Sequence, residues 1–328
     1  MKNRYFVTRN SCPSCESKSN KELYRAQYTE APISTYLNNF YNPQGGVEFN
    51  YLEGEYYILK ECKSCNLVYQ QDIPNDFLMV KLYEEWINPR IIINDKIKSK
   101  NIKPFTYKVK EIENVINHFD LPTSNLKFLD FGSGWGEWCS FAKSYGCEAF
   151  GCELSQSRID HSLKLGVPIL NWEEISNHQF DFINTEQVFE HIPNPLETLK
   201  YLVKSLKPNG VIKISVPNGG NIKNILSIMD WGAEKGTFNS LNAVAPLEHI
   251  NCFSEFSLIK MAEKIKLLPI ELKNNNVNNK FRNKKTKSFL DYSIKDILRP
   301  IYRIFKKRKK VKNYGSTYLF FSKNDYQD

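Results

Sequence analysis

The sequence predicts an α/β protein whose largest part is a doubly wound, mainly parallel sheet, preceded by a small module with paired cysteines. From about residue 126 onward, short apolar runs alternate with amphipathic segments, which is the pattern of strands linked by crossover helices. A glycine-rich turn at 132–136 connects the first of these runs to a helical segment. Two Cys-x-x-C pairs, Cys12/Cys15 and Cys62/Cys65, lie ahead of this region.

The paired cysteines have the spacing of zinc ligands. Two Cys-x-x-C turns can bring four thiolates to the corners of a tetrahedron, the geometry that Zn²⁺ prefers. The 46 residues between the pairs raise the entropy of loop closure only logarithmically. A redox role is the alternative for either pair alone, but neither pair opens a helix in a thioredoxin-like context. Because four cysteines leave no coordination position for a substrate, the sequence predicts a structural zinc held by Cys12, Cys15, Cys62 and Cys65.

Length and composition place the chain among soluble globular proteins. It has 328 residues, 41% of them hydrophobic and 25% charged, which excludes wholesale disorder. No apolar run approaches the roughly 18–20 residues needed to cross a bilayer, and the first residues lack the apolar core of a signal peptide. We therefore expect a cytoplasmic protein with reduced thiols.

The first 122 residues are expected to form two units. Residues 1–75 make the zinc-binding module, with a strand at 55–60 that leads into the second cysteine pair. Residues 76–122 are expected to be a helical linker or lid, with helices at 76–83 and 107–119, because apolar residues in the second segment recur at helical spacing.

The remaining chain is expected to hold seven strands and the helices between them. The strands are predicted at 127–131, 148–153, 168–170, 180–184, 210–216, 268–272 and 318–322. Helices are predicted at 137–145, 157–165, 195–205 and 256–265. This gives a core domain at 123–272, a basic insertion at 273–313, and a final strand and tail at 314–328.

The glycine turn is flanked by carboxylates, which a phosphate-binding turn would lack. Its sequence is Asp130-Phe-Gly132-Ser-Gly134-Trp-Gly136-Glu137, and it departs from the dinucleotide pattern G-x-G-x-x-G because Glu137 takes the place of the third glycine. A carboxylate near the turn suits a ligand with positive charge. Glu153 ends the next strand and can accept hydrogen bonds from both hydroxyls of a ribose. An adenosine with a cationic tail, S-adenosylmethionine, fits this arrangement, and a tight turn beside a surface glutamate is the alternative.

Residues 105–272 and the last strand resemble the class I S-adenosylmethionine-dependent methyltransferases. The resemblance rests on the glycine turn, on Phe180-Asp-Phe-Ile-Asn-Thr-Glu-Gln-Val-Phe-Glu-His-Ile and on Leu206-Lys-Pro-Asn-Gly-Val-Ile-Lys-Ile-Ser-Val-Pro. It implies a Rossmann-like, seven-stranded methyltransferase sheet. It also implies four groups of cofactor-binding residues: Asp130, Gly132, Gly134 and Gly136 around the methionine end, Glu153 at the ribose, Asn171 and Trp172 beside the adenine, and Glu186 and Gln187 below the fourth strand.

The cysteine pairs ahead of this domain resemble the N-terminal module of a subgroup of sugar-modifying methyltransferases. The string Glu248-His249-Ile-Asn-Cys-Phe-Ser is similar to one in that subgroup, where the histidine faces the acceptor. His191 follows the fourth strand, at the carboxyl edge where such folds bind ligands. The resemblance therefore implies His191, His249 and Glu248 as catalytic candidates, with helix capping or core packing as the alternative for either histidine. Tyr83 and Trp86 are candidates for an aromatic lid over a sugar, or for core packing.

One departure from the subgroup bears on the reaction. Ketosugar C-methyltransferases carry a tyrosine three residues before the second histidine, and Pro246 stands there in this chain. The resemblance consequently favours methylation of a sugar hydroxyl or amine, during surface-glycan or secondary-metabolite assembly, over ketosugar C-methylation.

The positive charge of the chain is concentrated in one segment. Residues 273–313 contain 15 Lys and Arg against two acidic residues, whereas the rest of the chain carries 30 basic and 34 acidic residues. The part from 288 to 310 reads as an amphipathic helix with a basic end. It suits peripheral contact with an anionic membrane surface, at the inner face, where a lipid-linked glycan acceptor would be found. Nucleic acid and packing on the protein's own domain are the alternatives.

These observations predict an enzyme that transfers a methyl group from S-adenosylmethionine to a small sugar acceptor. Two other classes remain open besides ketosugar C-methylation. A zinc-containing RNA methyltransferase would use the cysteine module and the basic segment to hold nucleic acid. A non-catalytic binding module would retain the fold without turnover, although the glycine turn and Glu153 argue against it.

Overall fold

The computed structural model describes residues 5–87, 103–273 and 315–323. The amphipathic helix expected at 288–310 and most of the basic insertion lie outside these residues. Among the described residues, no helix is both long and apolar enough to span a membrane.

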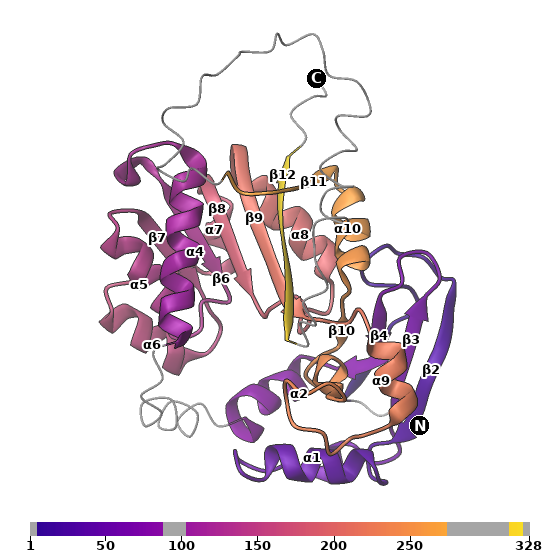
Figure 1. The fold of residues 1–328 in the computed structure, drawn as a ribbon. Coiled ribbons are helices and arrows are strands. Elements are labelled where there is room, and N and C mark those ends of the chain that lie inside the picture. Colours follow the sequence, from indigo (N-terminus) through magenta and orange to yellow (C-terminus); the bar gives the residue numbers. More distant parts are fainter. Residues whose placement is uncertain (1–4, 88–102, 274–314, 324–328) are drawn as a thin grey trace.

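The core of the molecule is a mixed sheet of six strands (Figure 1). Its strand order is β11-β12-β9-β8-β6-β7. Four strands run parallel to one another: β6 (Lys127–Phe131), β7 (Glu148–Cys152), β8 (Phe180–Glu186) and β9 (Leu206–Pro217). The last strand, β12 (Ser316–Lys323), runs antiparallel between β9 and β11 (Leu267–Ile270).

The count of seven strands expected from the sequence is wrong by one. The expected strand at 168–170 makes only an isolated parallel bridge between Ile169 and Gly151. Two backbone hydrogen bonds hold it, from Gly151 to the Pro168 carbonyl and from Leu170 to the Gly151 carbonyl. The chain then turns at once into α7 (Trp172–Ile175), so the ladder cannot extend. Residues 168–170 thus lie where a seventh strand would pair with β7, but they form only this single bridge.

Alternating side chains along the strands divide the core into two layers. Phe128, Phe182 and Val211 belong to one apolar cluster with α4 (Lys103–Phe119) and α5 (Glu137–Ser144). The next residue along each of these strands belongs to the other cluster, with α8 (Pro195–Lys204) and α10 (Glu255–Glu263). This two-residue period follows from the alternation of side chains across a sheet. One further helix, α6 (Gln156–Lys164), follows β7.

The N-terminal module is built on a second, antiparallel sheet. β2 (Asn20–Gln27), β3 (Tyr56–Cys62) and β4 (Val68–Gln70) are its first three strands. The fourth strand is β10 (Asn251–Cys252), from the distant part of the chain that precedes α10. The short strands β1 (Phe6–Thr8) and β5 (Asp72–Pro74) pair separately.

Helices complete the module and join it to the core domain. α1 (Ile33–Tyr41) and a 3₁₀ turn (Phe49–Tyr51) lie between β2 and β3. α2 (Asp76–Lys81) follows β5 and continues into a π-helical turn (Leu82–Trp86). The Asn75 side chain caps α2 by accepting a hydrogen bond from the Leu78 amide at 3.0 Å, a role for which asparagine is well suited.

A segment between β9 and β10 packs against the module rather than against the sheet that precedes it. It contains α9 (Ile222–Ile228) and a 3₁₀ turn (Leu241–Val244). Apolar side chains of α9 and Trp231 form one buried cluster with Tyr28, Leu37 and Tyr41. The sequence-based boundaries of the module, 1–75 and 76–122, remain a prediction, but its apolar core draws on residues 222–252 as well.

Candidate active site

The glycine turn after β6 holds three glycines in the left-handed region. Their φ angles are 75° at Gly132, 55° at Gly134 and 76° at Gly136. A Cβ atom at Gly132 would lie 2.4 Å from Val188, and one at Gly136 would lie 2.6 Å from the Ser162 hydroxyl. At Gly134 a Cβ would meet nothing within 4 Å. The outer glycines are thus required by packing, whereas the middle one borders open space.

Glu153, just after β7, holds this turn in place. One carboxylate oxygen accepts a hydrogen bond from the Gly134 amide at 2.9 Å. The other accepts from the amides of Leu154 at 2.9 Å and Ser155 at 3.0 Å. A carboxylate has about four acceptor positions, so capacity remains for a ligand hydroxyl. The structure brings Glu153 to the glycine turn, and its contact with a ribose stays a prediction.

Asp130, at the end of β6, is buried beneath the turn. It is 3% exposed and accepts a hydrogen bond from the Asn184 side chain at 2.7 Å. Burial raises the pKa of its carboxyl to about 7, while the Asn184 hydrogen bond and the charges of Lys108 and Lys213 act in the opposite direction. A cationic ligand nearby would favour the ionised form.

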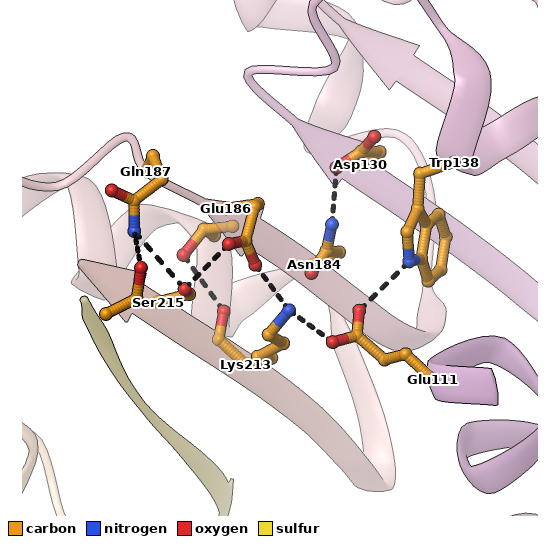
Figure 2. A network of polar contacts seen from close by, with 10 residues as sticks. Glu111, Asp130, Trp138, Asn184, Glu186, Gln187, Lys213 and Ser215 are labelled. Carbon is orange, nitrogen blue, oxygen red and sulfur yellow. Dashed lines mark hydrogen bonds and ion pairs between the residues drawn. The ribbon is translucent and has the colours of Figure 1, made fainter. Parts of the chain in front are cut away.

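A buried lysine organises the polar residues at the end of β8 (Figure 2). Lys213 Nζ on β9 donates to Glu111 of α4 at 2.6 Å and to Glu186 of β8 at 2.5 Å. Glu186 also accepts a hydrogen bond from the Ser215 hydroxyl, and Glu111 one from the Trp138 indole. Neither Lys213 nor Glu111 was expected from the sequence, because their segments show only apolar periodicity. The network fixes the orientation of Glu186 at the cofactor edge predicted for it.

Gln187 is positioned by β9 and β12. Its backbone has a φ of 56°, its amide donates to the Ser215 carbonyl, and its side chain lies 3.4 and 3.3 Å from the hydroxyls of Ser215 and Ser316. The left-handed conformation turns the chain away from the sheet directly after Glu186.

Asn171 and Trp172 lie at the start of α7. The Asn171 side chain accepts from the Glu174 amide, and Glu174 accepts from the Asn171 amide in return, forming a capping box. The Trp172 ring stacks on Tyr201 with centroids 4.1 Å apart. Asn171 thus has a structural role as a helix cap, and the contact of either residue with adenine stays a prediction.

His191 and His249 meet at the carboxyl end of β8. Their ring centroids are 4.9 Å apart. The Nδ1 atom of His191 lies 2.9 Å from the Glu248 carbonyl and 2.8 Å from the Tyr83 hydroxyl, and that of His249 lies next to the Asn242 carbonyl. Burial lowers the pKa of both rings, that of His191 to about 4. The structure therefore brings these two predicted residues together as neutral imidazoles.

The third predicted residue, Glu248, precedes His249 and contacts His191 through its backbone carbonyl. Burial raises the pKa of its carboxyl to about 7, and the charge of Lys235 acts against this. Of the two aromatic lid candidates, Tyr83 contacts His191 as described above. Trp86 is 2% exposed and donates its indole N–H to Glu48, so the core-packing alternative applies to it.

The four paired cysteines form one buried cluster. The Cys12 and Cys65 sulfurs are 3.5 Å apart, as are those of Cys15 and Cys62, and all four lie within 4.8 Å of one another. Thiolates at about 2.3 Å from a tetrahedral zinc would be separated by about 3.8 Å.

The two cysteine turns have the same pattern of backbone hydrogen bonds. In each turn the first cysteine carbonyl accepts from the amide four residues on, Glu16 or Asn66, and both of these residues have a positive φ. The first cysteine amide in turn donates to the carbonyl five residues on, Ser17 or Leu67. Burial raises the pKa of Cys15 to about 12, so a cation is needed to hold all four sulfurs as thiolates. The donor set fits Zn²⁺.

Comparison with known proteins identifies the central part of the chain. Residues 107–268, just under half of the chain, match the family model described as a methyltransferase domain. The ubiquinone biosynthesis O-methyltransferase of Proteus mirabilis (strain HI4320) is 26% identical over 150 residues, which are 40% of this chain and 60% of that protein. The protein of the same name from Rickettsia bellii (strain OSU 85-389) is 30% identical over 116 residues, or 33% and 48% of the two chains.

Two solved structures are similar to this chain at low sequence identity. The plantazolicin methyltransferase in complex with SAH is 15% identical, with a TM-score of 0.44, over 75% of this chain and 94% of that chain. The magnesium protoporphyrin IX methyltransferase from Synechocystis PCC 6803 with bound SAH is 11% identical, with a TM-score of 0.42, over 66% and 82% of the two chains.

The comparisons confirm the predicted fold class, a Rossmann-like methyltransferase sheet with helices on both faces. This chain spans about 60% of the length of the first curated relatives it matches. These relatives are named as ubiquinone O-methyltransferases, not as sugar methyltransferases, so the sugar acceptor stays a prediction.

Proposed function

We propose that this chain, whose residues 107–268 match the methyltransferase-domain family model, transfers the methyl group of S-adenosylmethionine to a hydroxyl group of a small acceptor, with a sugar as the first candidate. The observation that carries the proposal is the meeting, at one sheet edge, of an open glycine turn with two neutral histidines. The name O-methyltransferase of the curated relatives favours oxygen over nitrogen as the methylated atom.

The residues at the glycine turn fit the cofactor. Gly134 leaves the space into which a Cβ would project, Glu153 has remaining acceptor capacity, and Asp130 is a buried carboxyl that a cationic group would keep ionised. The sulfonium of the cofactor supplies an already activated methyl group, so the protein has to align donor and acceptor and accept a proton.

Glu248 is the group best suited to receive that proton. Its carboxyl pKa, raised by burial to about 7, makes it a base that is ready near neutral pH. His191 and His249 are each bonded through Nδ1 to a backbone carbonyl, which leaves Nε2 to face the acceptor. Zinc at the four cysteines has a structural role in this proposal, since the protein ligands fill the tetrahedron.

Cofactor binding is tested with two matched glycine variants. Gly134 and Gly166 both have a positive φ and open space around a built Cβ, but Gly166 follows α6 and lies outside the glycine turn. We expect Gly134→Arg to weaken S-adenosylmethionine binding by more than 100-fold in calorimetry, because the side chain fills the cofactor space. Gly166→Arg should bind like wild type. Equal binding by both variants would contradict the proposed cofactor site.

The acceptor class is tested by methyl transfer from radiolabelled S-adenosylmethionine. Three acceptor pools are compared, namely nucleoside-diphosphate sugars, a catechol and bulk transfer RNA. Label in the sugar fraction supports the proposal. Label only in the catechol or only in RNA would replace the acceptor while leaving the cofactor site intact.

A further inference from the structure

Among the residues that the structure describes, a buried glutamate beside the two histidines has no hydrogen-bond partner. Glu190 follows β8 and is 1% exposed. Within the described residues, neither of its carboxylate oxygens has a hydrogen-bond donor. A buried carboxylate without a donor or a cation destabilises the folded state by a few kcal/mol or is neutralised. A cation bound beside Glu190 would compensate the charge of its ionised form, and none of the described residues supplies a donor to it.

The atoms nearest to this carboxylate are metal-ligand atoms. His191 Nε2 lies 3.7 Å from a Glu190 oxygen. One donor atom from each of Glu190, His191 and His249 lies within 4.8 Å of the other two. Ligand atoms around a bound zinc or a similar ion lie about 3–4 Å apart, so modest side-chain rotations would close the set around one ion.

Hydrogen bonds to the backbone fix which nitrogen each ring offers. The carbonyls of Glu248 and Asn242 can only accept hydrogen bonds, so the Nδ1 atoms of His191 and His249 that contact them carry the protons. Both rings therefore keep the lone pair on Nε2. Histidines that bind metals in proteins show this same arrangement, with the second nitrogen donating to a backbone carbonyl or a carboxylate.

We propose that Glu190, His191 and His249 bind one divalent first-row metal ion through a carboxylate oxygen and the two Nε2 atoms. Two histidines and one carboxylate are the ligands of several catalytic metal sites, in which coordination positions stay open. If the proposed function holds, an open position lies where the acceptor hydroxyl is expected, and coordination there would lower the pKa of that hydroxyl. This site differs in kind from the four-cysteine cluster, which has no open position.

The test uses Mn²⁺ on the full-length protein with its cysteine cluster loaded with zinc. Nitrogen and oxygen ligands suit Mn²⁺, whereas thiolates prefer softer ions, so the two sites are read separately. We expect wild-type protein to remove one Mn²⁺ per chain from the free-ion signal in electron paramagnetic resonance. Glu190→Gln and His249→Gln should each weaken this uptake at least tenfold.

His178→Gln is the matched control for the loss of a histidine. His178 stacks on Phe180 at the other end of β8 and should leave Mn²⁺ uptake unchanged. Zinc content and circular dichroism of each variant show whether it has folded. If His249→Gln does not fold, the Mn²⁺ uptake of Glu190→Gln alone tests the metal site.

No saturable uptake by wild type, or equal uptake by Glu190→Gln, would overturn the metal site. Calorimetry with S-adenosylmethionine on the same samples keeps this result apart from the proposed function. Cofactor binding without Mn²⁺ uptake rejects the metal site alone, whereas Mn²⁺ uptake without cofactor binding rejects the methyltransferase proposal.

Discussion

Two buried groups of metal-ligand side chains in this molecule differ in how completely their polar atoms are satisfied. The four cysteines are held by two identical backbone turns, each with its own set of hydrogen bonds. The second group, Glu190, His191 and His249, comes from two segments of the chain, and within the described ranges 5–87, 103–273 and 315–323 both oxygens of Glu190 lack a donor. We call these the cysteine cluster and the histidine cluster.

From this difference we infer that the cysteine cluster stabilises the fold and that the histidine cluster serves the chemistry. The cysteine cluster lies in the same apolar core as Leu67, Tyr69 and Phe253, so a metal ion bound there should stabilise the folded state. The histidine cluster leaves a buried carboxylate unpaired, which is unfavourable for stability. Substitutions of buried polar groups should therefore change the free energy of unfolding by different amounts, depending on how well each group is compensated.

The largest effect is expected when the cysteine cluster loses a ligand. Cys62→Ser should lower the free energy of unfolding by about 5 kcal/mol or more, because structural zinc contributes roughly 10–16 kcal/mol to small zinc domains. Denaturant unfolding and metal analysis measure the two quantities involved. Cys147→Ser, at a buried cysteine outside the cluster, should keep the zinc. If both variants have equal stability and zinc content, the cysteine cluster is not a structural metal site.

A smaller loss is expected at Lys213, which forms a complete charge network without a metal. Lys213→Met would leave Glu111, which is 8% exposed, without its cation and should lower stability by about 3–5 kcal/mol. Denaturant unfolding measures it. Lys200→Met, which removes a surface pair with Glu197, should cause no measurable change. Equal effects from both would show that the network contributes nothing to stability.

The smallest effect is expected from Asp130, which should make the free energy of unfolding depend on pH. As in the histidine cluster, the charge of its buried carboxylate is poorly compensated. Its carboxyl pKa is raised by burial from 3.8 to about 7, so the folded state binds a proton that the unfolded state releases. That contribution is present below pH 3.8 and disappears as pH rises through 7. Without cofactor, wild type should lose about 2 kcal/mol from this group between pH 5 and 7.

Asp130→Asn isolates this contribution because its amide can still accept the hydrogen bond from Asn184. The difference in unfolding free energy between wild type and variant should shift by that amount across the pH range. Parallel curves would mean that Asp130 is already ionised at pH 5.

The features that the sequence predicted are those that repeat locally. Alternating residues such as Phe128 and Leu129 define strands, and the Cys-x-x-C spacing defines a ligand pair, because both patterns are fixed by the geometry of a few consecutive residues. The glycine turn was predictable for the same reason, since a positive φ at Gly134 demands glycine. The prediction of a strand at 168–170 was wrong because three residues are too few to form more than one isolated bridge.

The features that the sequence did not predict depend on tertiary contacts. Lys213 lies between two apolar residues of its strand, Ile212 and Ile214, and its partner Glu111 is more than 100 residues away. Glu190 was visible only as part of the Glu-His string, and no local pattern predicts that its oxygens find no donor in the part of the chain that the structure describes. The packing of α9 on the N-terminal module has no local signal either, because an amphipathic helix does not specify which surface covers it.

The two-residue strand β10 has a consequence for redesign of this protein. β10 pairs with β4, and the Arg9 guanidinium donates to Gln70, Ile250 and Asn251. Together these contacts attach the loop that carries His249 to the N-terminal module. A chimaera that exchanges only the module, or only the loop, would mismatch both partners. Acceptor preference should thus be transferable between such proteins only when residues 5–87 and 218–253 are exchanged as one piece, although they are far apart in the gene.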